Sequence, residues 1–181
     1  ATATRVNADG SSADLAGGIA LPGSLFLQEL VGAATPASAV TNSQFFQFTV
    51  GSAAGYGLNL GDLGFDAGRG GASNPRGWVL RSSIDGFAAN LGTDTIPTIQ
   101  PVLTHFSVDL SSASYQDLIT PVTFRIYGFA PFASGVGLFF DNLTLTGSVG
   151  DASILVPIPG ALAMFFAGLG SLAASARRVR N

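Results

Sequence analysis

Few side chains in this sequence could carry acid–base or metal chemistry. His105 is the only histidine, Glu29 is the only glutamate, and cysteine is absent. Without cysteine, a disulfide, a cysteine-ligated metal and a cysteine nucleophile are excluded. His105 and Asp109 would share one face of a strand, about 13 Å apart along it, which is too far for an acid–base pair. We therefore expect no catalytic residues, no cofactor and no metal, and we predict that the protein is not an enzyme.

The dispersed aspartates leave two alternatives open. In a hydrolase or lyase, Asp66 and Asp85 would be the least implausible acid–base pair. Together with Asp141 and Asn142, they also offer the hard oxygen ligands that calcium prefers, but these residues match no calcium-binding loop. We expect them to act as turn caps instead.

Polar residues at alternating strand positions are candidates for a ligand-binding face. Arg81, His105, Arg125 and Tyr127 would all point away from the core, and one sheet face could gather them. Arginine and tyrosine can donate hydrogen bonds and stack on sugars or other planar groups. The alternative is that these residues form the solvated face of an antiparallel sheet.

A stretch rich in glycine and phenylalanine, residues 128–140, is a candidate interface loop. Phe129, Phe132, Phe139 and Phe140 lie in or beside it. Exposed aromatic rings commonly mark a contact with a partner or a membrane. The alternative is that the rings fold over one end of the domain.

The elements that must position these residues have the pattern of strands. Alternation with a period of two recurs along residues 40–149, interrupted by turn residues, and helical periodicity is weak. The alternating segments are residues 44–50, 56–65, 78–84, 102–110, 122–126 and 138–146. The alternation slips at Asp141 and Asn142, which predicts a bulge there. We predict an all-β fold, a jelly-roll-like two-sheet sandwich.

Charge is scarce and unevenly distributed. Charged residues make up 10% of the 181 residues, all eight basic residues are arginine, and the formal net charge is −3. This balance argues against a nucleic-acid partner, which needs a basic surface. Residues 1–153 hold five arginines and eleven acidic residues, whereas residues 154–181 hold three arginines and no acid. The contrast predicts two segments in different environments.

The last segment has the pattern of a membrane anchor. Residues 154–176 carry no charge, and Pro157 and Pro159 would prevent a helix from starting before residue 160. A helix over residues 160–176 would be about 25 Å long, near the minimum for crossing a bilayer. Its terminal arginines would stay in the cytoplasm, which places the preceding domain on the periplasmic or extracellular side. The alternative is a buried C-terminal helix of a soluble domain.

Small residues recur every four positions along this expected helix: Ala163, Ala167, Ser171 and Ser175. Small side chains let membrane helices approach closely. The spacing predicts a helix-packing face for an integral membrane partner. The alternative is that such anchors are often rich in small residues without having a partner.

The tail also resembles a known family. Val156, Pro157 and Pro159, followed by the apolar stretch and then Arg177 and Arg178, resemble the PEP-CTERM sorting tail in its V-P-x-P variant. The position between the prolines is isoleucine, where the family usually has glutamate. The resemblance implies an exported bacterial protein that an exosortase recognises for surface attachment, often in bacteria that produce exopolysaccharide.

The preceding body shows a looser resemblance. Its aromatic and aspartate pattern, from Tyr56 to Phe87 and again over residues 140–145, resembles the jelly-roll bodies of exported PEP-CTERM proteins. Those bodies are similar to carbohydrate-binding modules. The resemblance implies a fold and suggests a binding role.

The resulting organisation has five parts: a Gly/Ala-rich arm at 1–40 with one edge strand, a β-sandwich at 41–149, a linker with the proline pair at 150–159, a transmembrane helix at 160–176 and an Arg-rich cytoplasmic end at 177–181. The leading hypothesis is a structural or docking subunit on the outer face of a larger membrane complex, for example respiratory or photosynthetic. The alternative is an exosortase-sorted cell-surface or exopolysaccharide-matrix protein with a carbohydrate-binding-like domain, whose partners would be glycans.

Overall fold

The structure is a computed structural model, and it describes residues 4–6, 12–13, 25–27, 33–70, 76–99, 101–130 and 137–152. In this part of the chain, no helix has both the length and the hydropathy needed to cross a membrane. The predicted tail features lie outside the described residues: Val156, Pro157, Pro159, the helix at 160–176 with Ala163, Ala167, Ser171 and Ser175, and the arginines Arg177 and Arg178.

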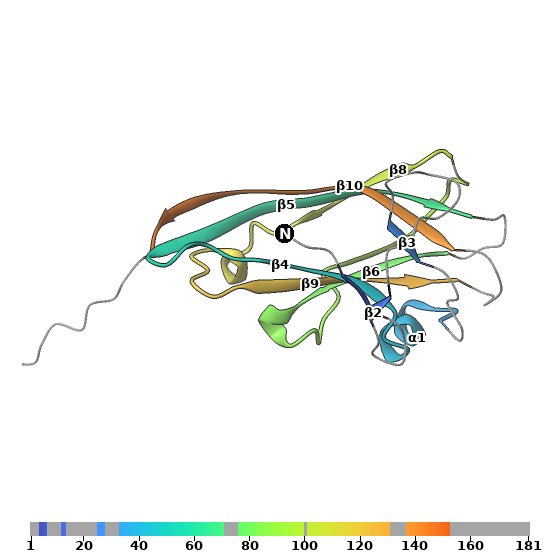
Figure 1. The fold of residues 1–181 in the computed structure, drawn as a ribbon, viewed down its shortest axis with the longest axis horizontal. Coiled ribbons are helices and arrows are strands. Elements are labelled where there is room, and N and C mark those ends of the chain that lie inside the picture. Colours follow the sequence, from blue (N-terminus) through green and yellow to red (C-terminus); the bar gives the residue numbers. More distant parts are fainter. Residues whose placement is uncertain are drawn as a thin grey trace, which may run out of the picture.

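Two antiparallel sheets pack face to face (Figure 1). The larger sheet has the order β2(Ser12–Ala13), β1(Thr4–Val6), β4(Phe45–Val50), β9(Val122–Phe129), β6(Gly77–Ser82) and β7(Gly92–Thr95). The smaller sheet has the order β3(Leu25–Leu27), β10(Leu138–Asp151), β5(Tyr56–Arg69) and β8(Thr104–Asp109). The prediction of an all-β, two-sheet sandwich is confirmed.

Aromatic rings from both sheets form the core. Phe65 of β5 packs edge-to-face on Trp78 of β6, with ring centroids 4.9 Å apart, and also contacts Phe106 and Phe140. Phe46 of β4 contacts the same Phe140 ring at 5.4 Å. Each ring lies on the inward side of an alternating strand, where its burial stabilises the fold by about 1.5–3 kcal/mol.

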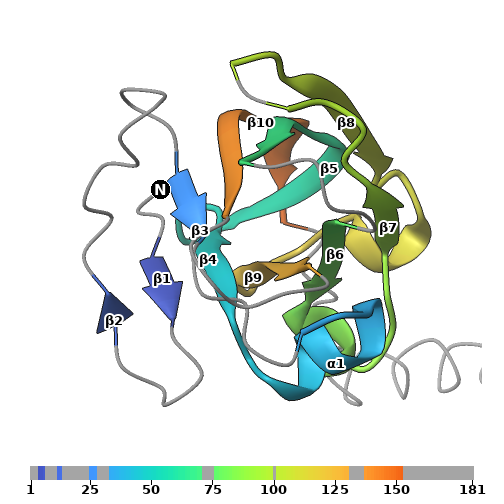
Figure 2. The same cartoon turned by 90° about the vertical axis from the view of Figure 1, so that its right-hand side faces the viewer.

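A short helix covers one end of the outer face of the larger sheet. Helix α1(Pro36–Thr41) begins at Thr35, whose hydroxyl accepts a hydrogen bond from the Ser38 amide and whose own amide donates to the Ser38 hydroxyl. The proline at the first position suits a helix start. The helix packs against β9 and β6 (Figure 2), and the outward-facing Val79 and Tyr127 are buried. This helix was not predicted from the sequence.

Strands β5 and β10 are 14 residues each and pair along nearly their whole length. The register shifts between Asp141 and Thr144, where Asn142 has a φ of +50°. This confirms the predicted bulge. Strand β3 pairs only with the first three residues of β10.

The sandwich extends beyond the predicted limits of 41–149. Strands β1 and β2 belong to the larger sheet and β3 to the smaller one, although all three come from the predicted arm. At the other end, β10 continues to Asp151. The arm therefore contributes to both layers, because β4 and β10 each offer a free edge on which a short strand can pair.

Candidate functional site

The structure divides the predicted ligand face between the two sheets. Arg81 on β6 and Arg125 on β9 are direct cross-strand partners on the outer face of the larger sheet. Tyr127 lies two residues further along β9, where it is 3% exposed and packs against Phe45. His105 lies on β8, in the smaller sheet. Its side chain therefore points outward on the other side of the sandwich. The four residues do not form one surface.

The predicted interface loop is not exposed where the structure describes it. Phe129 ends β9 and Phe139 and Phe140 begin β10, and all three are at most 3% exposed. Pairing within the sheets brings these rings into the packed interior, so they offer no surface to a partner. Phe132 lies outside the described residues.

On the smaller sheet, Asp66 is held by two neighbouring strands. His105 Nδ1 lies 2.7 Å from Asp66 Oδ1, and Asn142 Nδ2 donates to Asp66 Oδ2 at 2.7 Å. The Asn142 hydrogen bond and then the His105 contact lower the pKa of Asp66 below its ordinary value, against a smaller opposing effect of burial. Asp66 is therefore an ionised carboxylate with both oxygens held in place.

The bulge in β10 fixes the other polar groups nearby. Asn142 adopts the left-handed backbone region, which asparagine tolerates better than most residues. Its amide donates to Asp141 Oδ1 at 2.7 Å. Among the described residues, no donor reaches Asp141 Oδ2 or Asn142 Oδ1. The bulge thus presents two oriented acceptors with free lone pairs.

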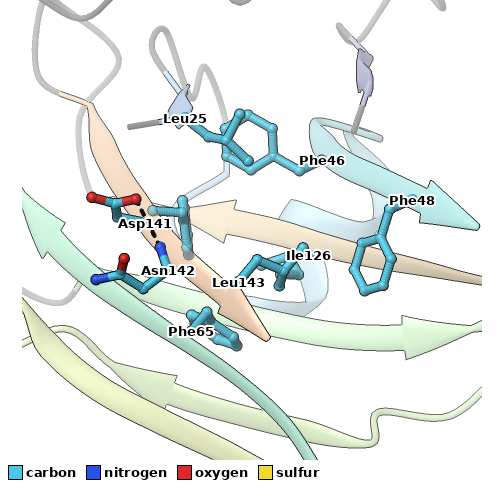
Figure 3. Close-up of a pocket in the computed structure, with 9 residues that line it drawn as sticks. Leu25, Phe46, Phe48, Phe65, Ile126, Asp141, Asn142 and Leu143 are labelled. Atoms are coloured by element: carbon cyan, nitrogen blue, oxygen red, sulfur yellow. Dashed lines mark hydrogen bonds between the residues drawn. The ribbon is translucent and has the colours of Figure 1, made fainter. Parts of the chain in front are cut away.

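A cavity of about 210 Å³ opens beside these acceptors, between the two sheets (Figure 3). Its wall consists mainly of apolar side chains from five strands. Asp141 and Asn142 lie at its edge, with their carboxylate and amide turned away from the apolar side chains. The lining residues are Leu25, Phe46, Phe48, Phe65, Ile126, Phe140, Asp141, Asn142 and Leu143. The bulge was predicted from the sequence, but the cavity was not, because it depends on how the sheets pack.

The remaining aspartate predictions have different outcomes. Asp85 ends the short helix η1(Ser83–Asp85), and its carboxylate accepts hydrogen bonds from the amides of Ala88 and Ala89. The predicted role of Asp85 as a turn cap is confirmed. Asp66 and Asp85 belong to different layers and do not form an acid–base pair. Within the described ranges, no group of three or more His, Cys, Asp or Glu residues could hold a metal ion.

A second, more open hollow lies between the edge strands β7 and β8. It has a volume of about 360 Å³ and is lined by Trp78, residues 91–94 and residues 106–109. The indole Nε1 of Trp78 is buried, with no acceptor among the described residues. Asp94 and Asp109 make the rim of this hollow acidic.

No protein-family model and no curated protein matches the chain. One similar solved structure is described as "CBM4 structure and function"; it shares 14% identity over 81% of this chain and 94% of that chain, with a TM-score of 0.46. Another is the K1 cleaved adhesin domain of Lys-gingipain from Porphyromonas gingivalis W83, with 15% identity over 82% and 99% and a TM-score of 0.36. At this level of similarity, neither assigns a function.

Proposed function

We propose that the chain is a non-enzymatic binding protein, anchored by its C-terminal segment on the outer face of a bacterial membrane, whose β-sandwich binds a neutral sugar unit of a glycan. The observation that supports the glycan is the apolar cavity at the β10 bulge, with two oriented acceptors at its edge. The looser sequence resemblance suggests a binding role for the same domain.

The two sides of the cavity match the two sides of a sugar ring. A pyranose has an apolar C–H face, which packs on aromatic and aliphatic side chains, and hydroxyl groups that donate hydrogen bonds. Phe48 and Leu143 offer the apolar surface inside the cavity, while Asp141 Oδ2 and Asn142 Oδ1 offer acceptors at its edge, on the outward side of the bulge. The volume of 210 Å³ is below the range of about 300–1,000 Å³ typical of pockets for drug-sized ligands, so it suits a single ring.

Charge favours an uncharged sugar at this cavity. Asp66 is ionised and hydrogen-bonded to Asn142, and the Asp141 carboxyl lies beside it as the cross-strand partner of Asp66. Two neighbouring carboxylates would repel an acidic sugar or a phosphate.

The test is a glycan array with the full chain, followed by affinity measurements on the best neutral ligand. Asn142→Gly keeps the left-handed backbone but removes the amide, and Leu143→Asp places a charge at the cavity wall. We expect Asn142→Gly to weaken binding about tenfold or more, the effect of one or two lost hydrogen bonds. We expect a similar loss for Leu143→Asp, because a charged side chain replaces an apolar contact. Ser148→Ala, exposed on the same strand, is the matched control. Equal affinity of Asn142→Gly and the parent chain would contradict the proposal, as would the absence of any neutral ligand.

The docking role remains a second candidate because of one surface feature. Tyr56 and Val149 are 46% and 60% exposed, and they lie on the paired ends of β5 and β10, next to the predicted linker. An apolar surface at this end could rest on a membrane complex. In that case the chain would co-purify stoichiometrically with integral membrane proteins, and Val149→Asp would release it. Purification of the chain alone under mild detergent would contradict this role.

A further inference from the structure

Two arginines face each other on the outer surface of the larger sheet. Arg81 of β6 and Arg125 of β9 are direct cross-strand partners. Like charges at such positions repel, and a nearby acid normally compensates them. The structure shows an ion pair between Asp66 and His105, in the other sheet, but none that involves Arg81 or Arg125 and a described residue. No described carboxylate therefore pairs with either guanidinium.

Arg125 is held in place by aromatic rings and an amide. Its guanidinium carbon lies 3.8 Å from the ring centroid of Phe87 and 4.4 Å from that of Phe45. Its Nε donates to Gln47 Oε1 at 3.0 Å. Cation–π contacts orient the guanidinium plane without using its N–H donors. Both terminal nitrogens of Arg125 are therefore left without a protein acceptor in the described part of the chain.

Arg81 is fixed by the loop that carries Phe87. Its Nε donates to Asn90 Oδ1 at 2.8 Å, and its Nη1 donates to the Phe87 carbonyl at 2.7 Å. Phe87 has a φ of +64°, an unfavourable backbone conformation for a bulky residue. Such strain persists where the surrounding structure imposes it and is concentrated at binding sites. Here it holds one residue against both arginines.

We propose that Arg81 and Arg125 form a binding site for an oxyanion, a carboxylate or a sulfate ester, carried by an acidic glycan. The two guanidinium groups are pre-oriented neighbours with free donors, and planar guanidinium groups bind such anions through paired hydrogen bonds. This inference rests on the proposed function for its ligand class, but it concerns a different surface. The cavity beside β10 takes a neutral sugar, and the arginine pair takes an acidic one.

The surroundings of the arginines favour a glycan over an acidic peptide or a lipid headgroup. On the same face, Thr49 and Thr123 are hydrogen-bonded through their hydroxyls at 2.8 Å, and Gln47 and Asn90 supply amides. These four side chains are polar and uncharged, so donors and acceptors lie close to the two arginines. The surface therefore matches the hydroxyl groups that flank an acidic sugar.

The test measures binding of the full chain to polygalacturonate and dextran sulfate, with dextran as the uncharged comparison and phosphatidylglycerol vesicles as the lipid comparison. We expect binding to an acidic polysaccharide that weakens as salt rises, because exposed charges are screened. Arg81→Gln and Arg125→Gln should each weaken binding about tenfold or more. Arg125→Lys should also weaken it, since lysine keeps the charge but loses the planar, ring-stacked donors.

The control is Val102→Asp, which makes the same change in net charge at an exposed position and should alter the affinity less than about twofold. Thermal unfolding checks that each variant folds, and Arg81→Gln removes neither of the rings that contact Arg125. The inference is overturned if neither acidic polysaccharide binds, if Val102→Asp weakens binding as much as Arg81→Gln, or if only vesicles bind.

Neutral-glycan binding lost in Asn142→Gly would then still support the cavity. Conversely, polygalacturonate binding without any neutral ligand would contradict the cavity and leave the arginine site supported.

Discussion

Asn142 donates a hydrogen bond to Asp66 across the β10–β5 ladder, at the point where β10 bulges. The contact links an irregular position of one strand to a regular position of the next. The irregular strand is thereby held in register, and the acceptors beside the cavity stay fixed. The stability of this contact should depend on the charge of Asp66.

Asp66→Asn should lower the free energy of unfolding at pH 7 by about 1 kcal/mol, because an ionised acceptor is replaced by a neutral group. The folded-state pKa of Asp66 lies below the ordinary value of 3.8, so its stabilising effect is present above that pH and is lost as the pH falls through the folded-state pKa. Urea unfolding at pH 7 and pH 3 measures the difference. Asp62→Asn, exposed on the same strand, is the control. If the parent chain and Asp66→Asn differed in free energy of unfolding as much at pH 3 as at pH 7, this explanation would be ruled out.

Tyr115→Phe should destabilise the fold by about 1–3 kcal/mol at neutral pH, because the buried hydroxyls of Tyr115 and Ser82 share a hydrogen bond of 2.6 Å. Burial raises the pKa of Tyr115 above its ordinary value of 10.0. The neutral phenol is thus favoured in the fold, and its contribution declines as the pH rises above 10. The difference in free energy of unfolding between the parent chain and Tyr115→Phe should therefore become smaller in alkaline solution. Denaturant titrations at pH 8 and above pH 10 measure it, and a difference that does not change with pH would contradict this explanation.

Gly77→Ala should be strongly destabilising, by about 1–3 kcal/mol or more. A methyl group at this position would overlap the Asp94 carbonyl oxygen and the Phe129 ring. Gly150→Ala is the matched control, because nothing lies within 4 Å of a methyl group there. Thermal melts of both variants check this, and similar melting temperatures would show that β7 can move away from β6.

Thr35→Ala should lower stability by about 0.5–2 kcal/mol, because it removes the cap of α1. Thr35→Ser keeps the hydroxyl and should restore most of the loss. Chemical denaturation of the two variants measures the difference. If the alanine and serine variants were equally stable, the hydroxyl would not be the stabilising group.

The strands of the sandwich were predictable where one face is buried. Residues 44–50 and 122–126 alternate clearly in sequence, because their inward rings and aliphatic chains meet the other sheet. Strand β7(Gly92–Thr95) has no apolar alternation and could not be recognised. Helix α1 is six residues long, too short for a periodic signal, although its threonine–proline start is a capping pattern visible in the sequence.

The candidate sites could be predicted only in part. Arg81 and Arg125 were identified as outward-facing residues, but their direct pairing depends on the register of strands far apart in the sequence. The Asp66–His105 contact joins residues that are 39 positions apart in the sequence, so it also depends on strand register. Alternation gives the direction of a side chain, and it does not give its neighbours on the next strand. Phe139 and Phe140 fell within the alternating segment 138–146, but their glycine-rich surroundings also have the composition of a loop, so their place between the sheets was left open.

The long β5–β10 ladder also determines how the domain would respond to tension. Strand β10 ends at the tip of the sandwich, paired with the start of β5 (Figure 1). Its hydrogen bonds run perpendicular to the strand. A force drawing on the chain after Asp151 along the strand axis would load many of these bonds in shear at once, whereas a sideways force would peel them one by one. The domain should therefore resist being stretched along its length far better than being pulled across it.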